Sequence, residues 1–219
     1  MLAGDMVSDN GKNMDMVFDT LRELSEEFDI YYGVGNHEIK LAINPRTKKR
    51  YFDYRKRIIE SGIHFMNNKS EYITRGNERI KICGLNISKR YYTKVWNRKK
   101  LPHAYVDRRI GKKLTEDKNI PVIMIAHTPE YFKDYCRWGA DIVISGHVHG
   151  GMLILPLVGG VIASSFELFP HYDFGEFDMK NDIDGHEAKM YLTRGLGSHT
   201  IPLRINNPPE IMVLKMKKG

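Results

Sequence analysis

Two histidines placed two residues apart, His147 and His149, offer the clearest chemistry in the sequence. They follow a short apolar run, Asp141–Ser145, and lie between Gly146 and the pair Gly150-Gly151. Extended backbone directs residues i and i+2 to the same side, so both imidazoles can face one point just past a strand end. Imidazole is the commonest side-chain metal ligand. The pattern therefore favours a metal site, although two ordinary loop histidines would give the same short signature.

A similar arrangement recurs at three other places. Each is a short apolar run that ends in a side chain able to bind a metal or transfer a proton: Leu2-Ala3 before Gly4-Asp5, residues 30–34 before Gly35-Asn36-His37-Glu38, and residues 122–126 before His127. In open α/β sheets, ligands bind at the carboxyl ends of the strands. Four strand ends of this kind would deliver their polar side chains into one crevice. The sequence therefore predicts a metal-dependent active site.

The order and wide spacing of these motifs resemble the calcineurin-like metallophosphoesterases along almost the whole chain. The runs Thr193–Gly197, Pro202-Leu203-Arg204 and Pro208-Pro209-Glu210 are similar to a bacterial branch of that family whose members are often membrane-associated. The resemblance implies an α/β fold, a two-sheet β-sandwich flanked by helices. The family begins with a strand ending in Asp-x-His, and this chain starts after that point. We therefore expect a single metallophosphoesterase-like domain over residues 1–219, truncated at its N-terminus and without that strand.

The resemblance also implies which residues bind metal. One ion would have four ligands, Asp5, Asn36, His127 and His147. The other would be bound by Asp5, His149 and the Asp and His of the absent motif. Nitrogen and oxygen ligands together suit Mn, Fe, Zn or Co better than Ca or Mg. Two ions are expected for the family. Because two ligands of one ion belong to the absent motif, a single bound ion is the alternative for this chain.

His37 is a catalytic residue rather than a ligand in the family, where it protonates the leaving oxygen as a general acid. The carboxylate that usually supports it lies just past the Gly-Asp pair. Ser8 stands in that place here, and Asp9 is the candidate substitute. His199 follows the C-terminal glycine motif and is a weaker candidate for contact with the substrate.

The implied activity is hydrolysis of a phosphomonoester or phosphodiester by a metal-bridged hydroxide, which is the chemistry of a phosphatase or phosphodiesterase. The alternative is a catalytically impaired relative that holds one metal and acts as a binding module. An in-frame coding sequence upstream of Met1 for a strand ending in Asp-x-His would favour the enzyme over the binding module.

Composition limits the partners. At 219 residues, with 42% hydrophobic and 28% charged residues, the chain has the size of one globular domain. It contains no signal peptide and no apolar run of the ~18 residues that a membrane span needs, and its compartment and oligomeric state stay open.

The net charge of +7 and the basic, aromatic segment Lys89–Lys100 fit a phosphate-binding cleft best, with membrane-surface association as another reading. Without a nucleic-acid-binding motif, we expect a small-molecule or lipid-like phosphoester and no specific nucleic acid.

The spacing of apolar residues predicts the elements that would position these motifs. Helices are expected over residues 13–28, 51–61, 107–117 and 129–138, and strands over 30–34, 63–66, 71–74, 79–85, 122–126, 142–145, 152–155, 160–163, 190–193 and 211–215. Residues 39–50 are expected to form a polar connection. Residues 86–107 have no clean period, and we expect them to form an insertion over the site.

Overall fold

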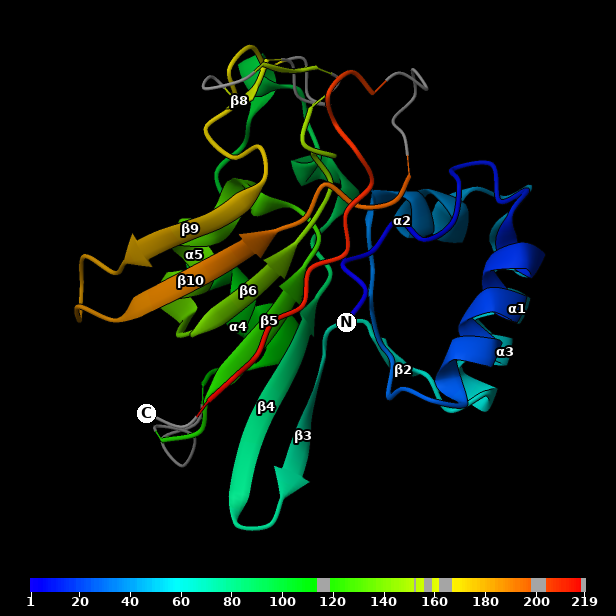
Figure 1. Ribbon diagram of the computed structural model, residues 1–219, viewed down its shortest axis with the longest axis horizontal. Helices are drawn as coiled ribbons and strands as arrows, with labels where there is room; N and C mark the ends of the chain where they lie inside the picture. Colours follow the sequence, from blue (N-terminus) through cyan, green and yellow to red (C-terminus); the bar gives the residue numbers. More distant parts are fainter. Residues whose placement is uncertain (114–118, 152, 156–158, 162–166, 198–203, 218–219) are drawn as a thin grey trace.

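The computed structural model describes residues 1–113, 119–151, 153–155, 159–161, 167–197 and 204–217. Its largest element is a six-stranded sheet in the order β3-β4-β5-β6-β10-β9 (Figure 1). The strands are β3 (Lys69–Arg75), β4 (Glu78–Leu85), β5 (Val122–Ala126), β6 (Ile142–Ser145), β9 (Gly175–Lys180) and β10 (Glu187–Leu192). The four inner strands are parallel, and β3 and β9 pair antiparallel at the edges. Parallel strands bring their carboxyl ends to one edge of the sheet, where binding sites form.

A second, smaller sheet packs against the first. It consists of β1 (Tyr31–Gly33) and β2 (His64–Met66), which are parallel, and Leu2 extends it through a parallel bridge to Tyr32. A buried cluster joins the two sheets and contains Tyr31, Met66, Ile82 and Ile125. The sheets approach so closely that a Cβ atom on Gly84 would lie 2.2 Å from the carbonyl oxygen of Met66. The expected pair of packed sheets is therefore confirmed.

Alternation along the strands explains why both faces of the large sheet are covered. Successive side chains of a strand point to opposite faces. Met124 and its even-numbered neighbours in β5 pack with α4 (Tyr105–Ile110) and α5 (Phe132–Trp138), whereas Ile125 packs toward the small sheet. In Figure 1, α4 and α5 lie on the far face of the large sheet. The continuous apolar run of β5 is the consequence of burial on both faces.

Three further helices cover the outside of the small sheet: α1 (Met14–Ser25), α2 (Asn36–Ile43) and α3 (Lys48–Glu60) (Figure 1). In α1 the buried positions are Met14, Val17 and Leu21, spaced by three and four residues as one helix face requires. They pack with Tyr54 of α3 and with other residues in a core of their own. None of the helices within the described ranges is long and apolar enough to cross a membrane.

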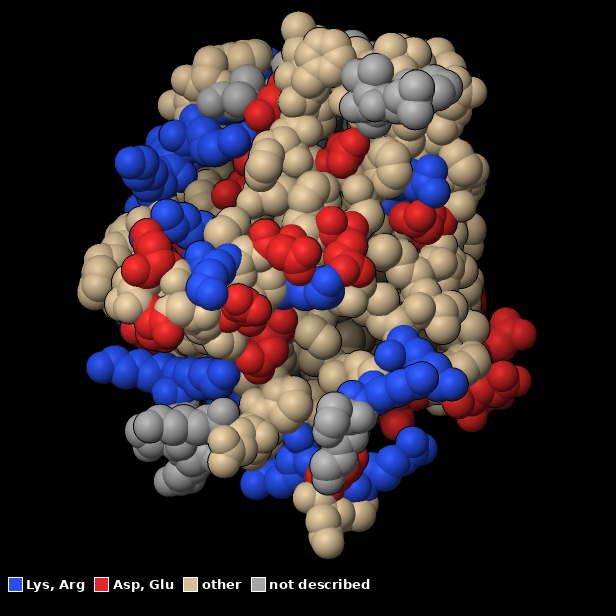
Figure 2. Space-filling model, turned by 60° about the vertical axis from the view of Figure 1, so that its left-hand side comes forward, with Lys and Arg blue, Asp and Glu red and all other residues tan. Residues whose placement is uncertain are grey.

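The edge strand β9 carries mixed charge. Its residues alternate between partly buried and exposed, and Lys189 of β10 pairs with both Glu176 and Asp178. Figure 2 shows Lys and Arg interspersed with Asp and Glu over this side of the molecule rather than gathered by sign. Charged side chains on an edge strand oppose pairing with another chain.

Several expected elements differ from the structure. The residues expected to form a polar connection contain most of α2. This helix has only eight residues, which is too short for a clear helical period in the sequence. The expected strand 211–215 is irregular, with Ile211 76% and Val213 91% exposed, because no strand pairs with it in the described residues. The helix expected over 107–117 ends early, at Ile110 before Gly111, whose φ is +81°; residues 114–118 lie outside the described ranges.

Smaller differences concern helix starts and short strands. The helix expected from residue 129 begins as a 3-10 turn, η4 (Pro129–Tyr131), before α5. The strands expected over 152–155 and 160–163 are represented by the short pair β7 (Ile154–Leu155) and β8 (Gly159–Gly160). Residues 152, 162 and 163 are not among those described.

Candidate metal centre

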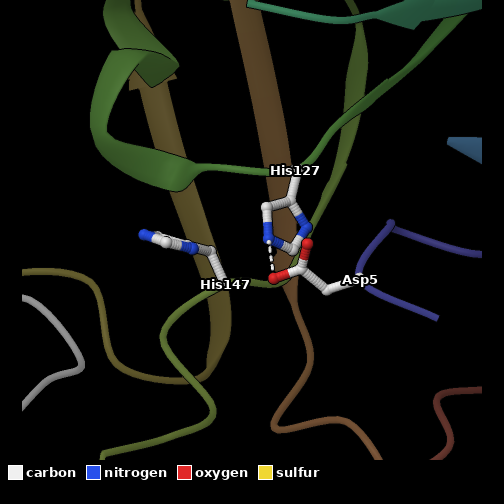
Figure 3. A group of neighbouring side chains, drawn as sticks. All are labelled: Asp5, His127 and His147. Carbon is white, nitrogen blue, oxygen red and sulfur yellow. Dashed lines mark ion pairs between the residues drawn. The ribbon is translucent and has the colours of Figure 1, made fainter. Parts of the chain in front are cut away.

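Three strand ends bring Asp5, His127 and His147 together. Asp5 lies three residues past Leu2 of the small sheet, His127 directly follows β5, and His147 lies two residues past β6. One ligand atom from each residue lies within 4.8 Å of the other two. Figure 3 shows the Asp5 carboxylate reaching His127 from the N-terminal segment, with His147 beside them. The predicted convergence of these three side chains is therefore present in the structure.

His127 is held in one orientation by its two ring nitrogens. Nδ1 donates a hydrogen bond to the carbonyl of Ala3 at 2.8 Å, and Nε2 lies 3.0 Å from Oδ2 of Asp5. The latter contact lacks hydrogen-bond geometry, so Nε2 is buried without a hydrogen-bond partner. A backbone acceptor at one nitrogen fixes the tautomer that leaves the other free to bind a metal. His127 therefore has the environment of a metal ligand.

The opposite charges of Asp5 and His127 shift the pKa of both side chains. Burial alone would raise the pKa of Asp5, but His127 and then His37 lower it well below its usual range. Burial lowers the pKa of His127, whereas the Asp5 carboxylate raises it, and the net direction is upward. Asp5 therefore remains a carboxylate, the form that binds cations.

The backbone around Asp5 is shaped for this position. Asp5 has a φ of +56°, in the left-handed region that most side chains avoid. Its Oδ1 accepts a 2.8 Å hydrogen bond from the backbone N–H of His37. A Cβ atom on Gly35 would lie 2.2 Å from the same Oδ1. Gly35 is therefore required because any side chain would displace the carboxylate.

Asn36 contributes the neutral oxygen of the expected ligand set. The residue is 9% exposed, and its Oδ1 is buried without a hydrogen-bond partner. Buried polar atoms are normally satisfied, and an exception of this kind often marks a site for an ion or water. Two orphaned atoms, Oδ1 of Asn36 and Nε2 of His127, therefore occur in residues of the same expected set. The residues present fit a transition metal with nitrogen and oxygen ligands.

His37, the expected general acid, lies beside this group. Its Nδ1 is 3.1 Å from the carbonyl of Val7, and its Nε2 is 3.7 Å from Oδ2 of Asp5. The expectation that Asp9 supports His37 is wrong, because the Asp9 carboxylate contacts Lys40 at 3.6 Å instead. The backbone carbonyl of Val7 takes the place of a carboxylate partner.

Glu38 was not identified from the sequence as a site residue. In the structure it holds the backbone on either side of the site in place. Fully buried, its carboxylate accepts hydrogen bonds from the backbone N–H groups of Asp5, Met6 and Gly35 and from the Tyr32 hydroxyl, at 2.8–2.9 Å. Burial, followed by the nearby Asp5 charge, raises the pKa of Glu38. The available signal was an acidic residue in the first turn of a helix, three positions after Gly35, from whose backbone N–H its carboxylate accepts a hydrogen bond.

The loop that carries His147 and His149 is a turn rather than extended backbone. Both histidines and the following Gly150 and Gly151 have φ between +55° and +82°. The premise that the two imidazoles share one side of an extended strand is therefore wrong. His149 lies outside the group formed by Asp5, His127 and His147, and its carbonyl accepts a 2.7 Å hydrogen bond from Asn207.

The insertion expected over the site does reach it. Tyr92, in the connection between β4 and α4, meets His147 edge-on, with ring centroids 5.3 Å apart. Burial, followed by the Asp5 charge, raises the pKa of Tyr92 well above its ordinary value. No sequence signal distinguished Tyr92 from the other aromatic residues of this segment. His199 lies outside the described residues.

The comparisons with known proteins agree with this geometry. The family model of the calcineurin-like phosphoesterases matches residues 1–151, and the chain belongs to that family. It is therefore a metallophosphoesterase, a member of a family of hydrolases that act on ester bonds.

Relatives extend the match to nearly the whole chain. An uncharacterized metallophosphoesterase of Aquifex aeolicus is 25% identical over 98% of this chain and 70% of its own length. One of Helicobacter pylori is 26% identical over 99% of this chain and 50% of its own. Phosphodiesterase YaeI of Escherichia coli is 27% identical over 99% of this chain and 69% of its own. The chain thus spans from half to 70% of the length of these relatives.

Among solved structures, NAD nucleotidase (NadN) of Haemophilus influenzae aligns with 87% of this chain and 35% of its own, at 15% identity and a TM-score of 0.48. The family assignment rests on the sequence matches.

Proposed function

We propose that this chain hydrolyses phosphoesters with metal ions bound at the group formed by Asp5, His127 and His147. The observation that carries the proposal is the convergence of ligand atoms from these three side chains within 4.8 Å. Asn36, whose Oδ1 is buried without a hydrogen-bond partner, lies between Gly35 and His37, which both contact Asp5. Asn36 completes one ligand set, and His149 serves a second ion. Both follow from the family pattern and await a test.

Mn, Fe, Zn or Co suits this mixture of ligands. When bound, such ions supply a water-derived nucleophile at neutral pH and neutralise charge on the phosphoryl group. The protein residues have separate tasks. Asp5 stays ionised, and Ala3 sets the tautomer of His127 through its carbonyl, which leaves Nε2 for a metal.

His37 donates the proton that the leaving oxygen needs. With Nδ1 directed at the Val7 carbonyl, Nε2 is the nitrogen left to face a substrate, and the side chain is 32% exposed. A proton held there can reach a ligand bound beside Asp5, and an imidazolium is a suitable donor near neutral pH.

The substrate class is a small-molecule or lipid-like phosphoester. The name phosphodiesterase on the Escherichia coli relative supports a diester over a monoester. The basic segment Lys89–Lys100, which contains Tyr92 of the site, would place positive charge beside an anionic substrate or a membrane surface.

The test combines metal content with hydrolysis. The Mn-loaded chain should retain metal after dialysis by elemental analysis and should hydrolyse bis(p-nitrophenyl) phosphate. Asp5→Asn and His127→Ala should lose both properties, whereas His103→Ala, at an exposed position, should keep them. Retained metal with no hydrolysis of mono- or diesters would favour the binding-module alternative. Failure of the unchanged chain to retain any metal would refute the proposal.

A further inference from the structure

Tyr92 lies against two of the three residues that form the metal group. Its ring is 5.3 Å from the His147 ring and 6.1 Å from the His127 ring, measured between centroids. It comes from the connection between β4 and α4, which contributes none of the expected metal ligands. Tyr92 therefore forms part of the wall of the site from a different element than any of the ligands.

The hydroxyl of Tyr92 is buried and has no hydrogen-bond partner among the described residues. The neighbouring tyrosines differ in this respect. The hydroxyl of Tyr91 accepts from Arg90, that of Tyr105 accepts from the Ser88 N–H, and those of Tyr131 and Tyr135 donate to backbone carbonyls. Among these five tyrosines, the one with the unsatisfied hydroxyl is the one whose ring lies against His127 and His147.

Contacts on both sides of Tyr92 hold its backbone in place. The Tyr131 hydroxyl donates to the carbonyls of Tyr91 and Lys99, both at 2.9 Å. The rings of Tyr91, Tyr105 and Tyr131 pack edge to face. A segment anchored in this way presents the Tyr92 ring in a defined position rather than as a loose surface side chain.

A phenylalanine at this position would keep the ring packing and avoid the unsatisfied group. A buried hydroxyl without a partner lowers stability, so its presence calls for a partner in another state of the molecule. Near Asp5, His127 and His147, the acceptors that binding would bring are the charged oxygens of a phosphoryl group. A hydroxyl donates a stronger hydrogen bond to a charged acceptor than to a neutral one.

We propose that Tyr92 is a substrate-binding residue that donates a hydrogen bond from its hydroxyl to an oxygen of the phosphoryl group held at the metal centre. This role rests on the proposed function and adds a protein donor to it. In this role Tyr92 orients the phosphoryl group and stabilises its charge, and the proton-donor role stays with His37.

The experiment compares Tyr92→Phe with Tyr91→Phe in the full 219-residue chain. Each protein is loaded with Mn, and its affinities for Mn and for inorganic phosphate are measured by isothermal titration calorimetry. We expect Tyr92→Phe to weaken phosphate binding by about tenfold or more, the usual effect of a lost hydrogen bond to a charged group. Its Mn affinity should not change, and its metal-free form should melt no lower than the unchanged chain. Tyr91→Phe should bind phosphate normally.

The outcomes distinguish this role from the proposed function. Equal phosphate affinity in Tyr92→Phe and the unchanged chain would overturn the role of Tyr92 and leave metal binding intact. Weaker phosphate binding in both variants would assign the effect to packing of the segment and would also overturn it. A visible phenolate-to-iron absorption band in the Fe³⁺-loaded chain, lost in Tyr92→Phe, would make Tyr92 a ligand instead of a donor. Absence of Mn binding in the unchanged chain would refute both proposals.

Discussion

Asn207 and His149 are 58 residues apart in sequence, yet Nδ2 of Asn207 donates a 2.7 Å hydrogen bond to the carbonyl of His149. The same amide donates to the carbonyl of Gly151, also at 2.7 Å. Asn207 is 3% exposed and lies beyond the residues 1–151 that match the family model. A C-terminal residue thus holds the turn that carries two expected metal ligands.

Asn207→Asp should weaken metal binding. The substitution keeps the shape of the side chain but replaces the donating amide by an oxygen that repels both carbonyls. Residues that orient metal ligands typically contribute 10–100-fold in affinity, and we expect a loss of about that size. Titration with Co²⁺, followed by its visible spectrum, measures it. The neighbouring exposed Asn206→Asp is the matched control, and equal affinities for the two variants would contradict the prediction.

His37→Ala should slow hydrolysis about 10²–10⁴-fold, the range for a lost general acid. The loss should be smaller for esters of p-nitrophenol than for esters of simple alcohols, because a good leaving group needs no proton. Steady-state kinetics on both kinds of ester give the ratio. Equal losses on both substrates would remove the proton-donor role from His37.

The metal-free chain should be most stable in weakly acidic solution. The lowered pKa of Asp5 contributes stability above its unfolded value of 3.8, and that contribution is lost as the pH falls toward the folded pKa. The raised pKa of His127 contributes stability below its unfolded value of 6.5, and that contribution is lost as the pH rises through the folded pKa. The pair therefore stabilises the fold most between these two unfolded values.

Thermal melts in EDTA should consequently show a higher Tm at about pH 6 than at about pH 9, and His127→Gln should reduce the difference. Added Mn should reverse the trend, because a metal binds the neutral imidazole and its stabilisation grows as the proton leaves. A metal-free Tm that rises steadily from pH 6 to 9 would be the opposite result.

Glu38→Gln should destabilise the chain by about 1.5–3 kcal/mol, the usual effect of weakening hydrogen bonds to a charged group. The carboxamide presents an N–H₂ group toward backbone N–H donors that now face a carboxylate oxygen. For a chain of this size the change corresponds to a fall in Tm of roughly 3–12 °C. Glu23→Gln, at an exposed position of α1, is the control. Comparable melting curves for the two variants would show that the buried carboxylate is dispensable.

The strand-end motifs and the packed sheets could be predicted because their signals are local. Apolar runs such as Val122–Ala126 mark strands buried on both faces, and the residue after each run is then near the site. The roles of Glu38, Tyr92 and Asn207 could not be predicted in this way. Each depends on a contact with a segment distant in sequence, and the residue types are common outside active sites.

Two wrong expectations have the same origin. The sequence places Asp9 near the position from which a carboxylate would support His37, but the chain turns so that the Val7 carbonyl lies there instead. His147 and His149 were expected on extended backbone because of their spacing, whereas the glycines around them permit a turn of residues with positive φ. Spacing alone does not specify the path of the backbone.

The distances in sequence that the site spans have a consequence for folding. His127 and Ala3, whose Nδ1 and carbonyl form a hydrogen bond, are 124 residues apart. Asn207, still later in the chain, donates a hydrogen bond to the carbonyl of His149. Closing long loops is entropically costly, and contacts of this range tend to form late. During synthesis, a nascent chain whose Asn207 has not yet left the ribosome would lack the contact that holds the His149 turn. Metal capture would then follow the assembly of both sheets, and a bound ion would report that the whole chain has reached its native topology.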